Sequence, residues 1–104
     1  MFHVLVALAG DPRHGYAILK AVSDRTAGAV ELSTGTLYTM IKRLLAEGLI
    51  VESRQRPAAT EDDERRRYYR LTEFGQRVLA AETERLQSMV AAARSAGVLA
   101  RRPS

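Results

Sequence analysis

The side chains that could do chemistry in this sequence are cations that lie close to small hydroxyl groups. A serine and three threonines between residues 33 and 39 precede the pair Lys42 and Arg43, and a second basic group lies between Arg65 and Arg70. Short hydroxyl groups can hydrogen-bond to base edges, and lysine and arginine bind phosphate oxygens and guanine. The net charge of +4 has the sign that a polyanionic partner requires. The pattern therefore favours binding to double-stranded DNA.

Catalytic and metal chemistry have little support. The chain has two histidines, His3 and His14, and no cysteine, which excludes thiol catalysis, disulfides and thiolate zinc sites. No paired carboxylates lie at a spacing that demands acid–base chemistry, and no glycine-rich phosphate loop occurs. Four consecutive carboxylates run from Glu61 to Glu64, but they lack the alternate spacing and turn glycine of a calcium loop. We expect a solvated acidic loop there, and no enzyme, cofactor or metal site.

The first basic group lies on a predicted helix. Ser33 is a good N-cap, because its hydroxyl can accept from a free backbone N–H of the first turn, and Gly48 is a natural stop. The predicted helix therefore runs from about Thr34 to Glu47. Its core-facing stripe, at helical spacing, comprises Leu37, Ile41, Leu44 and Leu45.

The opposite face of this helix is small and polar at its start and cationic one turn later. Lysine and arginine are common on the wet side of any surface helix, so the first turn carries the argument. Threonine and glycine are poor helix formers, and other residues would stabilise a helix better on a surface that binds nothing. A helix that enters the major groove, however, needs short side chains there. The predicted DNA contacts on this helix are Ser33, Thr34, Gly35, Thr36, Tyr38, Thr39, Lys42 and Arg43.

A β-hairpin, or wing, is predicted after this helix. Its strands span about Leu49 to Arg56 and Arg66 to Leu71, with a loop between them. Side chains alternate along a strand, so only about half of the arginines can face DNA. If Tyr69 and Leu71 face the core, Arg66 and Tyr68 face the other way, and we expect Arg66 to contact DNA near the wing tip.

The last predicted helix begins after the cap Thr72 and runs from Glu73 to about Ala96. Phe74 and Val78 lie on its apolar side, and apolar residues repeat at intervals of seven farther along, as in a coiled-coil seam. This surface exceeds what one helix can bury against so small a body. We therefore predict a homodimer whose interface comprises Leu79, Leu86, Met89, Val90 and Ala93.

The N-terminal part completes a winged helix-turn-helix plan. A short helix is expected to end near Ala9, a break follows at Gly10 to Arg13, and a second helix runs from His14 to Ala27. The fold class is thus mostly α with a β-hairpin: a winged helix-turn-helix domain over residues 1–72, a dimerisation helix over 73–97 and a flexible tail over 98–104. With no signal peptide and no membrane span, we expect a cytoplasmic protein.

Four motifs, in order and at similar spacing, give the chain a family resemblance. They are His14 to Tyr16, Leu32 to Tyr38, Arg43 to Ile50 and Arg67 to Gly75. Together they resemble the PadR family of bacterial repressors over about Val4 to Leu79. The resemblance implies a homodimer on a two-fold operator, with C-terminal helices at the interface and a response to small aromatic or lipophilic compounds. It also implies that Tyr38 packs on the sugar-phosphate backbone, and that Gly15 and Tyr16 serve packing.

The sequence departs from the family pattern at several points. The predicted first helix is short, although this helix often helps to dimerise members of the family. The C-terminal region is a single short helix, which is typical of the small subgroup. No tryptophan is present, so a tryptophan-lined drug pocket does not carry over. Thr34 and Thr39 stand where the family usually has proline, and threonine is tolerated in a first helical turn.

Two alternatives remain open. A winged helix that binds protein instead of DNA should have apolar residues on the outer face of its third helix, whereas this face carries Gly35, Thr39, Lys42 and Arg43. A lipophilic effector could bind between subunits near Met89, where small neighbouring residues leave room. The competing interpretation is a tight seam without a cavity.

Overall fold

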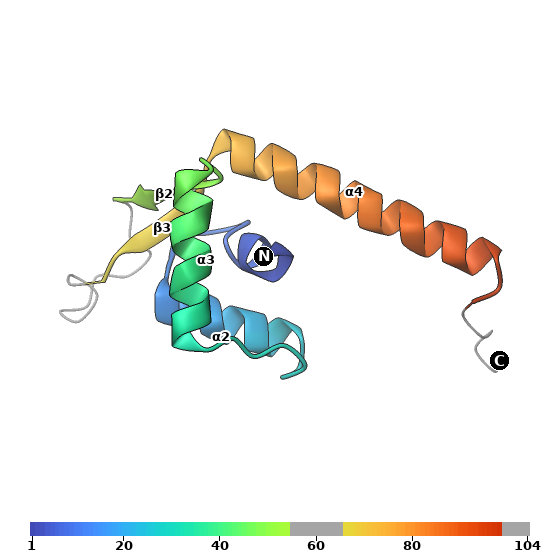
Figure 1. Cartoon of the computed structure of the whole chain (residues 1–104), viewed down its shortest axis with the longest axis horizontal. Coiled ribbons are helices and arrows are strands. Elements are labelled where there is room, and N and C mark those ends of the chain that lie inside the picture. The colour runs from blue at the N-terminus through green and yellow to red at the C-terminus, as the bar shows by residue number, and fades with distance from the viewer. Residues whose placement is uncertain (55–65, 99–104) are drawn as a thin grey trace.

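The computed structural model describes residues 1–54 and 66–98. The predicted wing loop and residues 99–104 of the predicted tail lie outside these ranges. Helices predominate over a small sheet, which confirms the predicted fold class (Figure 1). The elements are α1 (Phe2–Ala7), β1 (Arg13–His14), α2 (Gly15–Arg25), α3 (Thr34–Ala46), β2 (Ile50–Ser53), β3 (Tyr68–Leu71) and α4 (Glu73–Ser95).

Side-chain caps begin the three longer helices. The Ser33 hydroxyl accepts from the backbone N–H of Thr36, and the Thr72 hydroxyl accepts from that of Gly75, as the sequence predicts. At α2 the cap is His14, whose Nδ1 accepts from the backbone N–H of Ala17. Each cap satisfies one of the free donors of the first turn and so determines where its helix begins.

The sheet has an unexpected third strand. Its order is β1-β3-β2, all antiparallel, with Arg13 opposite Tyr69 and His14 opposite Tyr68. The sequence predicts only a break before α2, because two residues show no periodicity. Because β1 makes β3 the central strand, both Tyr68 and Tyr69 are buried. The sequence leads us to expect Tyr68 to face away from the interior, and this expectation is wrong.

The core forms where α1, α2 and α3 meet the sheet. Leu37, Ile41 and Leu44 of α3 are fully or almost fully buried, as predicted. Leu45, in contrast, is 39% exposed, because it lies about 80° around the helix from Leu37. Phe74 is also exposed, since the neighbouring Gly75 faces the body. The predicted places of Leu45 and Phe74 in the apolar interior are therefore wrong.

The last helix leaves the body as a long arm (Figure 1). Its first turns pack against the rest of the chain, where Val78 and Leu79 contact the core cluster and α1 lies alongside. Over the described ranges, no helix has the length and apolar character needed to cross a membrane.

Candidate nucleic-acid interface

The predicted outer face of α3 is open to solvent. All eight residues predicted to contact DNA from this helix are exposed, and a Cβ added at Gly35 would meet nothing within 4 Å. Ser33 donates to the Thr36 hydroxyl over 2.8 Å, and Thr39 donates to the carbonyl of Gly35 over 3.0 Å. These bonds hold the small side chains close to the helix, so a DNA backbone or base edge can approach it.

The two cations follow one turn later. Lys42 and Arg43 are both exposed, and Arg43 Nε lies 3.2 Å from Glu47 Oε1. An exposed ion pair of this kind contributes about 0–1 kcal/mol to stability. Arg43 can therefore exchange Glu47 for a phosphate or a base edge at little energetic cost.

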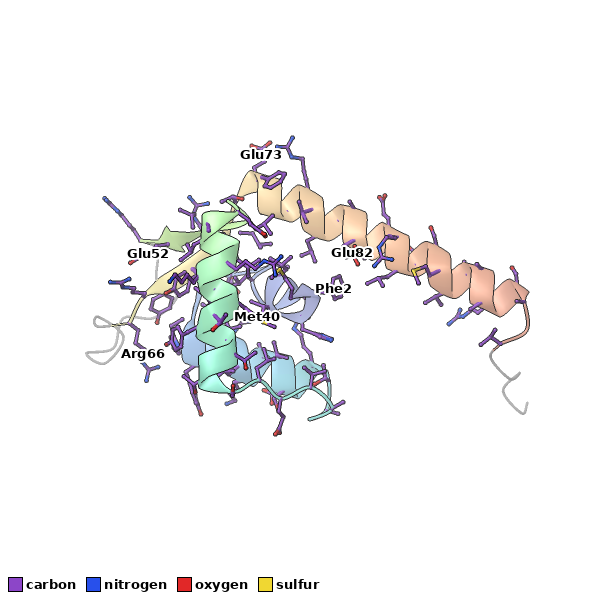
Figure 2. The ribbon with its side chains drawn as sticks, in the orientation of Figure 1. Phe2, Met40, Glu52, Arg66, Glu73 and Glu82 are labelled. Carbon is purple, nitrogen blue, oxygen red and sulfur yellow. The ribbon has the colours of Figure 1, made fainter. Side chains whose placement is uncertain are left out.

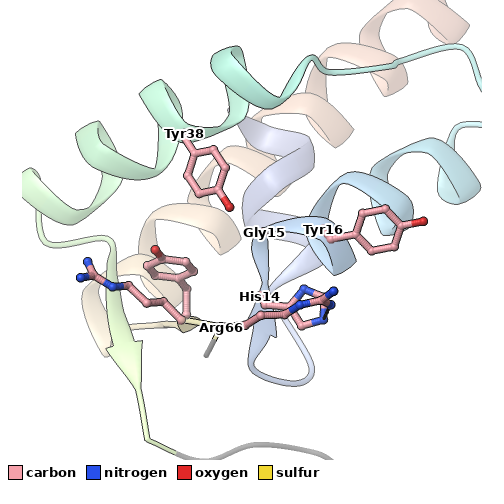
Figure 3. A pocket seen from close by; sticks show the side chains of 7 residues that line it. His14, Gly15, Tyr16, Tyr38 and Arg66 are labelled. Carbon is pink, nitrogen blue, oxygen red and sulfur yellow. Dashed lines mark hydrogen bonds between the residues drawn. The ribbon is translucent and has the colours of Figure 1, made fainter. Parts of the chain in front are cut away.

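A cleft of about 390 Å³ lies between α3 and the sheet (Figure 3). Tyr38 points into it from α3, and Arg66 reaches it from just before β3, at the end of the sheet farthest from α4 (Figures 2 and 3). The cleft thus joins two predicted DNA contacts that are 28 positions apart in the sequence. It is lined by His14, Gly15, Tyr16, Tyr38, Arg66, Arg67 and Tyr69.

Gly15 lets Tyr38 enter the cleft. A Cβ at Gly15 would lie 2.9 Å from the Tyr38 hydroxyl, so a larger residue would push the ring away. The expected packing role of Gly15 agrees with this contact. Tyr16 does not pack as expected: it is 65% exposed, and its ring stacks beside that of His14 at a centroid distance of 6.4 Å.

His14 and Arg66 meet at one side of the cleft. Arg66 Nη1 lies 3.1 Å from His14 Nε2, and the His14 ring also contacts Tyr68 edge-on. The sequence predicts Arg66 but not His14 as part of a binding surface. Only the pairing of β1 with β3 brings these two residues together.

Arg67 and Tyr69 also line the cleft. Burial raises the pKa of the Tyr69 phenol, and Glu52 and Tyr38 add to this effect while the Arg67 charge opposes it. The phenol therefore stays protonated at neutral pH and can donate a hydrogen bond.

The five residues predicted at the dimer interface lie on the arm. Met89 and Val90 are exposed, whereas Leu79, Leu86 and Ala93 are half-buried. Within the described ranges, no cluster of three or more metal-ligating side chains occurs.

Residues 4–81 match the transcriptional regulator PadR-like family. The chain belongs to the PadR family. Its members are transcriptional regulators, so the family confirms the sequence-based prediction that the chain is not an enzyme. No curated protein matches the sequence at a significant level.

Solved structures share the fold of this PadR-family chain. A transcriptional regulator from Clostridium thermocellum has a TM-score of 0.73 at 23% identity, with 90% of this chain and 85% of that one covered. A PadR family regulator from Clostridium difficile has a TM-score of 0.71 at 24% identity, with 90% and 95% covered. Bacillus subtilis PadR, solved in complex with operator DNA, has a TM-score of 0.64 at 19% identity, with 79% and 45% covered.

Proposed function

We propose that this PadR-family protein is a repressor that binds a two-fold operator as a homodimer. The observation that carries the proposal is the exposed face of α3, where small hydroxyl residues lead to Lys42 and Arg43 with no exposed aliphatic side chain among them. The operator complex of Bacillus subtilis PadR, which shares this fold, supports it. In this proposal residues 1–72 bind DNA, residues 73–97 form the dimerisation helix, and the protein acts in the cytoplasm.

The test of DNA binding removes the cations of α3. Lys42→Ala combined with Arg43→Ala should weaken binding to a duplex selected from random-sequence DNA by roughly 1–3 kcal/mol, because each cation contacts phosphate or a base edge. The matched control is Lys20→Ala with Arg25→Ala, which removes two exposed cations from α2 and changes the net charge equally. Fluorescence anisotropy measures both.

Two results would contradict this placement of the interface. One is a folded Lys42/Arg43 variant that binds as tightly as the wild type, and the other is a control pair with an equal loss. Failure of the wild type to bind any duplex would instead favour the protein-interaction function.

The proposed dimer rests on the apolar side of the arm. Leu86, Met89, Val90 and Ala93 lie within about 100° of one another around α4. Beyond Leu79, none of the described apolar residues of α4 packs against the core cluster. An isologous pair of such helices would remove this surface from water in both subunits.

The test of the dimer puts a charge into that surface. Leu86→Asp should convert the dimer to monomer in sedimentation equilibrium, because the carboxylate would be buried without a partner. Ser88→Asp, on the opposite side of α4, adds the same charge and should leave the dimer intact. A stable dimer after Leu86→Asp would place the interface elsewhere, for example at α1.

A lipophilic effector is the last part of the proposal. It would bind between the two α4 helices near Met89, whose pliable side chain and small neighbours leave room. A series of phenolic acids and hydrophobic cations should include a compound that releases the DNA, and Met89→Trp should abolish that release by filling the space. If no compound releases DNA, or if the Trp variant responds unchanged, no effector site exists there.

A further inference from the structure

One hydroxyl on the outer face of α3 has a fixed hydrogen-bonding role. Thr39 Oγ1 donates to the backbone carbonyl of Gly35 over 3.0 Å. A carbonyl can only accept, so the single hydrogen of this hydroxyl is engaged by the helix itself. The lone pairs of Thr39 Oγ1 remain, and none of the described residues donates to them. Thr39 therefore presents a hydrogen-bond acceptor, and not a donor, to anything that approaches α3.

The position of Thr39 makes this acceptor accessible. Thr39 is exposed and lies about 160° around α3 from the fully buried Leu37, so it points away from the core. Gly35, one turn earlier on the same face, has no side chain, and a Cβ there would meet nothing within 4 Å. The edge of a base pair can therefore approach the Thr39 oxygen across Gly35.

An acceptor in the major groove distinguishes between the bases. Adenine presents its N6 amine and cytosine its N4 amine as donors, whereas guanine and thymine present carbonyl oxygens, which only accept. The Thr39 oxygen can take a hydrogen bond from either amine. A guanine or thymine carbonyl would meet it lone pair to lone pair, and the hydroxyl could donate to that carbonyl only by giving up its bond to Gly35.

We propose that Thr39 reads one base in the major groove by accepting a hydrogen bond from the exocyclic amine of an adenine or a cytosine. The inference rests on the proposed DNA binding and adds the class of base that α3 selects at one position of each half-site. Lys42 and Arg43, on the same face, can only donate, so Thr39 supplies the complementary specificity. Thr39 stands where the family usually has proline, which has no hydroxyl, so this contact distinguishes the chain from that pattern.

The first test compares the base preferences of matched variants. Thr39→Val removes the hydroxyl but keeps a β-branched side chain of similar helix propensity, so the fold should be unaffected. Duplexes selected from random-sequence DNA should show adenine or cytosine at one position of each half-site for the wild type. In Thr39→Val this preference should fall roughly 5-fold, the worth of one neutral hydrogen bond, while the preferences at other positions remain.

Two further variants separate base recognition from a structural role. Thr39→Ser keeps the hydroxyl and should keep the preference. Thr83→Val removes an equivalent bond from α4, where Thr83 Oγ1 donates to the carbonyl of Leu79 over 2.8 Å, and should change no preference. If Thr39 only stabilised the helix, Thr39→Val would weaken binding to all sequences alike, and that result would overturn the inference.

The second test removes the amine from the DNA. A purine without its 6-amino group, or a pyrimidine without its 4-amino group, replaces the base at the preferred position. The analogue also loses a Watson–Crick hydrogen bond, so its effect is compared between proteins as a double-mutant cycle. It should weaken binding of the wild type roughly 5-fold more than binding of Thr39→Val. An equal loss in both proteins, or a Thr39-dependent preference for guanine or thymine, would contradict the acceptor role.

These outcomes also distinguish the inference from the proposed function. If the wild type binds duplex DNA through Lys42 and Arg43 but Thr39→Val has unchanged base preferences, Thr39 reads no base, while DNA binding through α3 stands. If the wild type binds no duplex, both fall.

Discussion

Gly75 is the position where one added methyl group should damage the fold most. A Cβ there would lie 1.9 Å from the carbonyl oxygen of Leu49 and 2.9 Å from its carbonyl carbon. Contacts under 3.0 Å force a shift, so α4 and the residue before β2 must separate by at least about 1 Å. The obstacle is backbone, which cannot swing aside as the end of a side chain can.

The magnitude follows from three contributions. Overpacking costs about 1–3 kcal/mol. The same carbonyl accepts from the backbone N–H of Thr72 over 3.0 Å, and losing this bond costs about 0.5–1.5 kcal/mol. The better helix propensity of alanine returns about 1 kcal/mol. We expect Gly75→Ala to lower the free energy of unfolding by about 2 kcal/mol.

Thermal unfolding followed by circular dichroism measures this effect at one fixed protein concentration, because a dimer melts in a concentration-dependent way. A loss of this size should lower Tm by roughly 8 °C in a chain of this length. Gly35→Ala is the matched control: it also lies in a first helical turn, but its Cβ would meet nothing within 4 Å. A Gly75→Ala variant that melts with the wild type would refute the steric reasoning.

Two further predictions concern single contacts. Gly15→Ala should push the Tyr38 hydroxyl out of the cleft, so anisotropy should show weaker DNA binding while Tm stays near the wild-type value; unchanged binding would contradict it. A hydrogen bond from Arg85 holds the pKa of Glu82 below its usual range, so the stabilisation is present at neutral pH and is lost as the pH falls through that pKa. Arg85→Ala should return the pKa to its ordinary value in an NMR titration, and an unmoved pKa would exclude this cause.

The helix starts were predictable because they depend on neighbours in the sequence. Ser33 and Thr72 begin α3 and α4 where the capping pattern places them, since each hydroxyl reaches a backbone N–H three residues on. The outer face of α3 was predictable for the same reason: a helical period places Lys42 away from the buried Leu37.

The cleft was not predictable, because it depends on a pairing between distant segments. Two residues of β1 show no strand period, and yet their contact with β3 joins His14 to Arg66 across 52 positions. The burial of Tyr68 has the same origin. The exposure of Tyr16 follows from its place on the cleft rim, and no local pattern marks that rim.

The joint between β3 and α4 has a mechanical consequence. The hydroxyl of Thr72 donates to the carbonyl of Gly48, directly after α3, and Gly75 lies against Leu49, so α4 starts without a loose linker. Its 23 residues make a lever of about 34 Å, close to one turn of DNA. In the proposed dimer, a 5° change in the crossing of the two arms would displace each α3 by about 3 Å. The angle at which the two α4 helices cross would thus set the distance between the two α3 helices. A change in this angle would alter that distance without any change within either DNA-binding domain.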